Sequence, residues 1–210
     1  LGFILKRRDF RETSLIANLY TLRFGKITGI FKGFYTLKKE FSSSLDLFSL
    51  NEFIFYPKRR QIWLISFADL VCDYPFLREN SVKAKMAALF FSLVDKVMQP
   101  WDKNPDIFYL LQEGIQSLGQ ENGPKSLYVF LIKFLTLSGF KPELNCCICC
   151  HSQLEDEICF SVSRGGLLCR KCLGQESGVQ KISRQAASSL RYIQRTDYPL
   201  VYRLNPTSAC

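Results

Sequence analysis

Two pairs of cysteines carry the clearest chemical signal in this 210-residue sequence. Cys147 and Cys150 form one C-x2-C pair, and Cys169 and Cys172 form a second pair after 18 intervening residues. Two residues between the cysteines let both thiolates of a pair turn toward one ion, and the spacer lets the second pair face the first. The pattern predicts one tetrahedral four-thiolate zinc ion, which is structural because no coordination position is left open.

Neighbouring residues leave alternatives to this ligand set. Cys146 and Cys149 have the same spacing shifted by one residue, and His151 could replace one thiolate. A cluster of reduced, buried cysteines without metal is a further alternative, because free Cys is often buried. Seven of the nine cysteines lie between Cys146 and Cys172, and such clustering in a chain without a recognisable signal peptide favours metal over disulfides.

The positive charge of the sequence is concentrated in its first 60 residues. The formal net charge of the chain is +9, and residues 1–60 carry 12 Lys or Arg against 5 Asp or Glu. An anionic partner is the natural match for such a surface, and nucleic acid is the commonest one. The alternative is a solvated basic surface that serves only solubility.

Aromatic residues are interleaved with this charge at Phe31, Phe34, Tyr35 and Phe41. Single-stranded nucleic acid needs both features, because its phosphates attract cations and its unpaired bases stack on aromatic rings. Aromatic residues at strand spacing also form barrel cores, so a role in packing is the alternative. The predicted nucleic-acid contacts are Lys6, Arg7, Arg8, Arg11, Lys26, Lys32, Lys38 and Lys39.

Five short strands are expected in the first 70 residues. These segments are rich in Ile, Leu, Phe, Tyr and Trp and are separated by turn-like stretches. A break between the third and fourth strand is compatible with a five-stranded OB barrel or a small SH3-like barrel. The expected strands are 2–6, 14–22, 26–31, 48–56 and 62–70.

Beyond residue 75 the apolar residues recur at helical spacing. We expect one helix after a Ser81 N-cap and a second that begins at Pro105. A third helix is expected at 124–137, before Gly139, and Ser183 is expected to cap a last helix.

No catalytic constellation is found in the sequence. His151 is the only histidine, so a Ser–His or Cys–His pair has no base outside the cysteine cluster. Neither a G-x-x-x-x-G-K-[ST] loop nor a G-x-G-x-x-G loop is present. We therefore expect a binding protein and no enzyme. The alternatives are a zinc-dependent nucleic-acid enzyme, which would need an open metal position, and a protein-binding adaptor with a basic barrel.

Several segments resemble the RecO family. Residues 6–12 (KRRDFRE) and 21–33 (TLRFGKITGIFKG) are similar to its opening turn, its T-x-x-x-G-K hairpin and its KG pair. Residues 140–144 (FKPEL) and 165–169 (GGLLC) are similar to the family's segments before the two cysteine pairs. The similarity runs in the same order over residues 1 to about 175.

This resemblance implies an OB fold, a helical domain and a zinc knuckle in the register of Cys147 and Cys150. It implies a DNA repair and recombination mediator that binds single- and double-stranded DNA and anneals complementary strands. It further implies that the protein helps RecR load RecA onto DNA coated by single-strand-binding protein, whose C-terminal tail it contacts. In two places the chain departs from the family: Phe34 and Tyr35 follow the KG pair where basic residues are usual, and His151 stands where Gly is common.

The expected architecture is therefore α+β and multidomain. An N-terminal OB-type barrel at residues 1–75 is followed by a helical domain at 76–210, with the four-cysteine zinc knuckle inserted at about 145–175. No apolar run reaches the ~18 residues of a membrane span. We expect a cytoplasmic protein that acts at the bacterial nucleoid.

Overall fold

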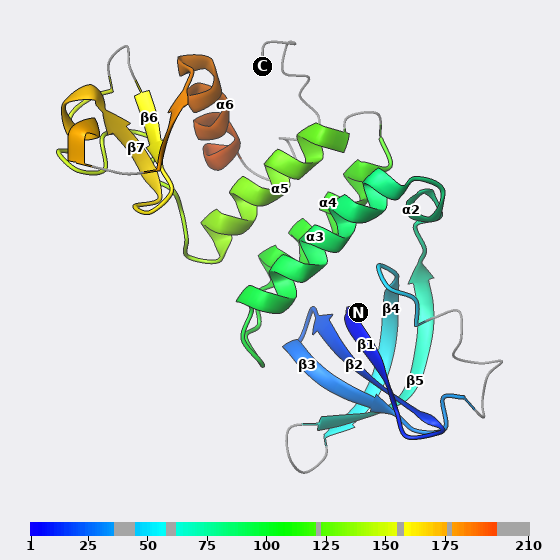
Figure 1. The fold of residues 1–210 in the computed structure, drawn as a ribbon. Helices are drawn as coiled ribbons and strands as arrows, with labels where there is room; N and C mark the ends of the chain where they lie inside the picture. Colours follow the sequence, from blue (N-terminus) through cyan, green and yellow to red (C-terminus); the bar gives the residue numbers. More distant parts are fainter. Residues whose placement is uncertain (36–44, 58–61, 121–122, 155–157, 176–177, 197–210) are drawn as a thin grey trace. The chain divides into compact units, whose positions relative to one another are not determined.

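The computed structural model describes most of the chain (Figure 1). The chain folds into two compact units, Leu1–Leu127 and Tyr128–Cys210. The predicted domain division near residue 75 stays a prediction. Among the described residues no helix is long and apolar enough to cross a membrane. The described ranges are 1–35, 45–57, 62–120, 123–154, 158–175 and 178–196.

A closed barrel with strand order β1-β2-β3-β5-β4 forms the first part of unit 1 (Figure 1). Strands β3 and β5 pair in parallel, and the other neighbours pair antiparallel. This closure confirms the expected five-stranded barrel and is the topology of an OB fold. The strands are β1 (Gly2–Phe10), β2 (Ser14–Thr21), β3 (Gly25–Phe31), β4 (Leu50–Pro57) and β5 (Ile62–Cys72).

Strand β1 changes from apolar to charged at a β-bulge. Ile4 pairs with Leu19 and Lys6 pairs with Asn18, so Leu5 is the extra residue. Residues 2–5 are buried, whereas residues 6–10 are exposed. The strand therefore runs four residues beyond its expected end, and its second half projects basic side chains from a paired strand instead of a turn.

Three helices lie wholly within unit 1 after the barrel: α2 (Phe76–Glu79), α3 (Ser81–Val97) and α4 (Pro105–Leu118). The Asn80 side chain caps α3 by accepting the N–H groups of residues 82 and 83, so the expected Ser81 N-cap is wrong by one residue. Helices α3 and α4 pack on the barrel through aromatic rings. Phe3 of β1 lies 5.7 Å from Phe91 and 5.4 Å from Phe108, measured between ring centroids.

Unit 2 contains a three-stranded sheet that the sequence did not predict, in the order β7-β6-β8. Helix α6 (Arg184–Arg195) begins at its expected Ser183 cap and is joined to the chain before the first cysteine pair. Arg191 Nε donates to Leu144 O at 2.9 Å, and Gln194 Nε2 donates to Pro142 O at 2.8 Å. The other elements are α5 (Gly123–Leu137, which begins in unit 1), β6 (Ile158–Ser161), β7 (Gly166–Cys169), the 3-10 helix η2 (Arg170–Gln175) and β8 (Val179–Ile182).

Candidate metal centre and basic barrel surface

Four thiols from two segments converge in unit 2. The Sγ atoms of Cys147, Cys150, Cys169 and Cys172 all lie within 4.8 Å of one another. Those of Cys150 and Cys169 are 3.7 Å apart. Metal–sulfur bonds of about 2.3 Å in a tetrahedron place the sulfurs about 3.8 Å apart. The four residues therefore fit a tetrahedral metal ion.

Backbone hydrogen bonds hold the two cysteine pairs against each other. Ile148 N–H donates to Leu167 O at 2.8 Å, and Leu167 N–H donates to Glu143 O at 2.9 Å. Gly166 is required at this contact, because an added Cβ would lie 2.8 Å from the Ile148 side chain and 3.0 Å from Glu143 O. Gly165 has a φ of +68° and supplies the turn into β7. Main-chain contacts thus bring both pairs together.

Hydrogen bonds within the cluster shift the pKa values of two of its thiols in opposite directions. Two hydrogen bonds from Ser152 lower the pKa of Cys150 to about 6. The bond from the Ser152 hydroxyl has the larger effect, and the bond from its N–H has the smaller one. Hydrogen bonds raise the pKa of Cys172, and the bond with Cys150 contributes more than the bond with Cys169. A bound divalent cation would favour the thiolate form of each cysteine in the cluster.

The alternative metal ligands near the first cysteine pair do not join the cluster in the structure. Cys146, Cys149 and His151 do not belong to the group of converging ligand atoms found among the described residues. Cys159 is buried and packs as a small apolar residue. His151 has a φ of +57°, and its N–H donates to Cys147 O at 2.9 Å. This left-handed backbone explains why Gly suits the position.

The second half of β1 forms a basic surface on the barrel. Lys6, Arg7 and Arg8 line a cavity of about 240 Å³ together with Ile16 and Asn18 of β2. These three cations are exposed, as are two others of the predicted set, Arg11 at the β1–β2 turn and Lys32 after β3. Arg11 has a φ of +57°, and its guanidinium lies 5.4 Å from the Phe10 ring centroid.

Two of the predicted DNA contacts have protein partners. Arg7 donates to Leu45 O at 2.8 Å and lies 3.6 Å from a carboxylate oxygen of Asp46. Lys26 lies 2.9 Å from Asp95 Oδ1 of helix α3, and only 17% of its side chain is exposed. Lys26 therefore joins the barrel to the helix. Lys38 and Lys39 lie outside the described residues.

For two of the four aromatic residues near the basic segment, the structure supports the alternative role in packing. Phe31 and Phe34 are 2% and 8% exposed and belong to the barrel core, so they present no ring face to a base. The Tyr35 hydroxyl hydrogen-bonds to Asp9, and Phe41 lies outside the described residues.

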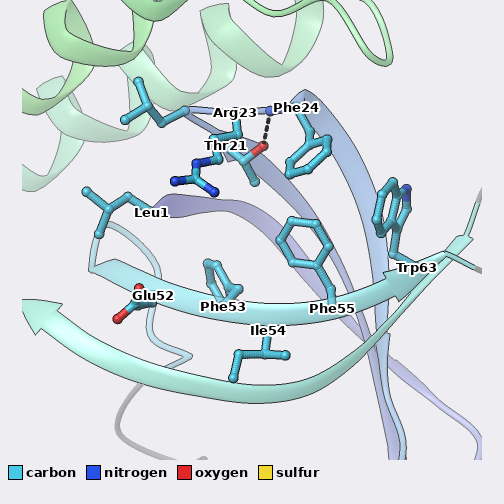
Figure 2. A pocket seen from close by; sticks show the side chains of 10 residues that line it. Leu1, Thr21, Arg23, Phe24, Glu52, Phe53, Ile54, Phe55 and Trp63 are labelled. Atoms are coloured by element: carbon cyan, nitrogen blue, oxygen red, sulfur yellow. Dashed lines mark hydrogen bonds between the residues drawn. The ribbon is translucent and has the colours of Figure 1, made fainter.

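A different aromatic group lines a cavity of the barrel: Phe24, Phe55 and Trp63 (Figure 2). This group was not predicted from the sequence, since its three residues come from separate strands and turns. The TLRFGK hairpin, which carries Phe24 at its tip, was the available signal.

Comparisons with known proteins agree with this architecture. Residues 1–74 match the family model "Recombination protein O N terminal", and residues 78–209 match "Recombination protein O C terminal". The chain is 30% identical to the DNA repair protein RecO of Syntrophus aciditrophicus, over 81% of this chain and 68% of that protein. It is 27% identical to that of Alkaliphilus metalliredigens, over 97% of this chain and 83% of that protein. The chain therefore belongs to the RecO family of DNA repair proteins, a family of non-enzymatic proteins.

Proposed function

We propose that this chain is a recombination mediator that binds single- and double-stranded DNA and anneals complementary strands. In this role it helps RecR load RecA onto DNA coated by single-strand-binding protein, whose C-terminal tail it contacts. It acts in the cytoplasm at the nucleoid. The observation that carries the proposal is a basic surface on a RecO-family barrel, where β1 projects exposed cations beside a cavity.

The DNA contacts that we propose are Lys6, Arg7, Arg8, Arg11, Lys26, Lys32, Lys38 and Lys39. Among those described, the strongest support is for the exposed Lys6 and Arg8, which lie two residues apart on one strand and have no ion-pair partner among the described residues. Cations at this spacing meet the phosphates of a nucleic acid backbone without reading its sequence. Annealing then follows from neutralising two strands that are held close together, with no covalent chemistry.

We propose that the four-cysteine cluster holds one structural Zn²⁺ ion. Thiolate ligands in a tetrahedral set suit zinc, and four protein ligands leave no position for a substrate. The residues that would hold it are Cys147, Cys150, Cys169 and Cys172. Bound zinc would fix the two cysteine pairs together and so stabilise the small sheet of unit 2. This role gives no support to a zinc-dependent nuclease or deaminase.

Charge reversal on β1 tests the proposed DNA surface. In Lys6→Glu with Arg8→Glu, we expect weaker binding to labelled single-stranded DNA by fluorescence anisotropy. The slope of log K against log salt should also become shallower by about 1.4, because each lost phosphate contact removes about 0.7. Complementary-strand annealing, followed by loss of a single-strand fluorescence signal, should slow in the same variant.

The matched control is Lys85→Glu with Lys181→Glu, which changes the net charge equally at two exposed residues that belong to α3 and β8 and not to β1. If both double variants lose affinity equally, the effect comes from net charge and the β1 surface is not the DNA site. If neither variant changes the affinity or the slope, the assignment to β1 is wrong.

A further inference from the structure

The barrel contains a second cavity at the end away from the β1–β2 turn. Its volume is about 470 Å³, within the range of ligand pockets. The cavity opens where β1 and β4 separate, since these strands pair only through Gly2–Asn51 and Phe3–Leu50 among the described residues. From Glu52 onward, β4 continues beside β5 with its other edge facing the cavity. The opening is therefore a consequence of how the barrel closes.

Three aromatic rings form one side of this cavity (Figure 2). The Phe24 ring centroid lies 5.4 Å from those of Phe55 and Trp63, and the latter two lie 4.9 Å apart. The rings meet at steep angles and do not stack on one another. Phe24 is 40% exposed although it lies among apolar neighbours. This group offers aromatic surface to a flat ligand.

The hairpin that carries Phe24 is held in place before any ligand arrives. Thr21 Oγ1 accepts the Phe24 N–H at 3.1 Å and donates to Gly25 O at 2.9 Å. Gly25 has a φ of +65° and packs so tightly that an added Cβ would lie 2.1 Å from Asp102 O. Trp101 packs against the group, with its ring centroid 5.2 Å from that of Trp63. Little conformational entropy would be lost when a ligand binds such a site.

Polar groups of both signs lie at the other side of the cavity. Figure 2 shows the Arg23 guanidinium and the Glu52 carboxylate on the side opposite Trp63. Both residues are exposed, and they form no ion pair with each other. A guanidinium binds phosphate oxygens, and a carboxylate accepts hydrogen bonds from the exocyclic amine of a base. A nucleotide unit presents a flat ring, an amine edge and a phosphate, which match these three features.

We propose that this cavity, the aromatic cavity, binds one unpaired base of single-stranded DNA. The base stacks on the Phe24 side of the aromatic group, and Arg23 contacts an adjacent phosphate. The excess of 12 basic over 5 acidic residues in residues 1–60 favours a nucleic acid over a peptide as the occupant. This inference rests on the proposed function, since it assigns a base-binding subsite to the same barrel. It also separates the two kinds of contact: β1 binds phosphates of any strand, whereas the aromatic cavity admits only an unpaired base.

The distance between the β1 surface and the aromatic cavity is compatible with one continuous strand of DNA that contacts both. The eight residues of β2 run from the β1–β2 turn, near Arg11, to the hairpin that carries Phe24. At about 3.3 Å per residue, β2 spans about 23 Å. Single OB folds bind about 4–16 nucleotides, so one strand can reach both surfaces.

The test uses the two tryptophans of the chain. In a Trp101→Phe background, Trp63 is the only tryptophan, and its fluorescence should be quenched when a 15-mer of deoxycytidine, whose bases carry an exocyclic amine, binds. Phe24→Ala in this background should weaken binding of the oligonucleotide about 5- to 150-fold, which is the loss of one stacked base. The salt slope and the affinity for duplex DNA should stay unchanged, because no phosphate contact is removed.

Two controls make the result specific. Phe67→Ala removes a similarly exposed ring on β5 that does not line the aromatic cavity, and it should leave binding unchanged. On a 15-mer with abasic sites in place of the bases, Phe24→Ala should bind as tightly as its parent. Thermal unfolding checks that each variant is folded.

The outcomes distinguish this inference from the proposed function. If the parent chain binds no DNA at low salt, the proposed function itself fails. If the parent binds and β1 variants weaken binding, while Phe24→Ala equals Phe67→Ala and Trp63 is not quenched, the base subsite is wrong and DNA binding stands. Quenching of Trp63 by an acidic peptide, with none by the oligonucleotide, would also overturn the inference and assign the cavity to a peptide.

Discussion

Replacing Cys150 with Ser tests the ligand set of the metal centre, with Cys149→Ser as its matched control. The two residues are adjacent, but only the Sγ atom of Cys150 lies within 4.8 Å of the other three thiols of the cluster. Structural zinc sites contribute about 10–16 kcal/mol of binding free energy in small peptides, so an even share for each of four thiolates is about 2.5–4 kcal/mol. We therefore expect Cys150→Ser to lower metal affinity by roughly 70- to 900-fold.

The assay is competition with a chromophoric zinc chelator, together with thermal unfolding of the metal-loaded protein. Cys149→Ser should keep one zinc per chain and unfold within about 1 kcal/mol of the parent, the usual range for a partly exposed substitution. Equal losses of affinity in both variants would refute the assignment of Cys150, and a loss in Cys149→Ser alone would place the site in the shifted register. Unchanged zinc affinity in both variants would contradict a four-thiolate site.

Three further predictions concern His151 and Ser152 beside the cysteine cluster and Lys26 of the barrel. His151→Gly should stabilise the metal-free protein by about 0.5–1 kcal/mol in urea unfolding, because it removes the strain of a φ of +57° at some cost in chain entropy. Ser152→Ala should raise the pKa of Cys150 from about 6 toward its ordinary value of 9, because the Ser152 hydroxyl bond is lost. The Cys150 thiolate of this variant is then protonated as pH falls from 9 to 6. Metal affinity measured over this pH range should therefore decline more steeply than in the parent. Lys26→Met should destabilise the fold by about 1–3 kcal/mol, because Asp95 loses its partner, and adding Asp95→Leu should recover part of this loss in the urea midpoint.

Local signals were sufficient to predict the four longest helices, to within one residue at their starts, and the convergence of the two cysteine pairs. Asn104 followed by Pro105, and Ser183 before an amphipathic segment, mark helix starts through backbone N–H groups that only a side chain can satisfy. The thiols of each C-x2-C pair lie close together because a spacing of two residues lets both side chains turn to the same side. In these cases the residues that decide the structure lie within a few positions of one another.

Features that depend on distant residues could not be predicted in the same way. The sheet of unit 2 has strands of four residues, too short for a clear alternating pattern. Lys26 looked like a free surface cation, because nothing near it in sequence identifies Asp95, 69 residues later, as its partner. Phe31 and Trp63 are both aromatic residues on strands, but the barrel buries the first and leaves the second beside a cavity. Which ring becomes accessible depends on where the barrel separates, and that is a property of the closed sheet.

The most direct test of the central claim is fluorescence anisotropy with labelled single-stranded DNA over a salt series, on folded protein whose zinc content has been measured. We predict tight binding at low salt, a steep fall in affinity as salt rises, and about one zinc per chain. Absence of binding at low salt in a zinc-loaded, folded sample would contradict the assignment of the basic barrel to DNA.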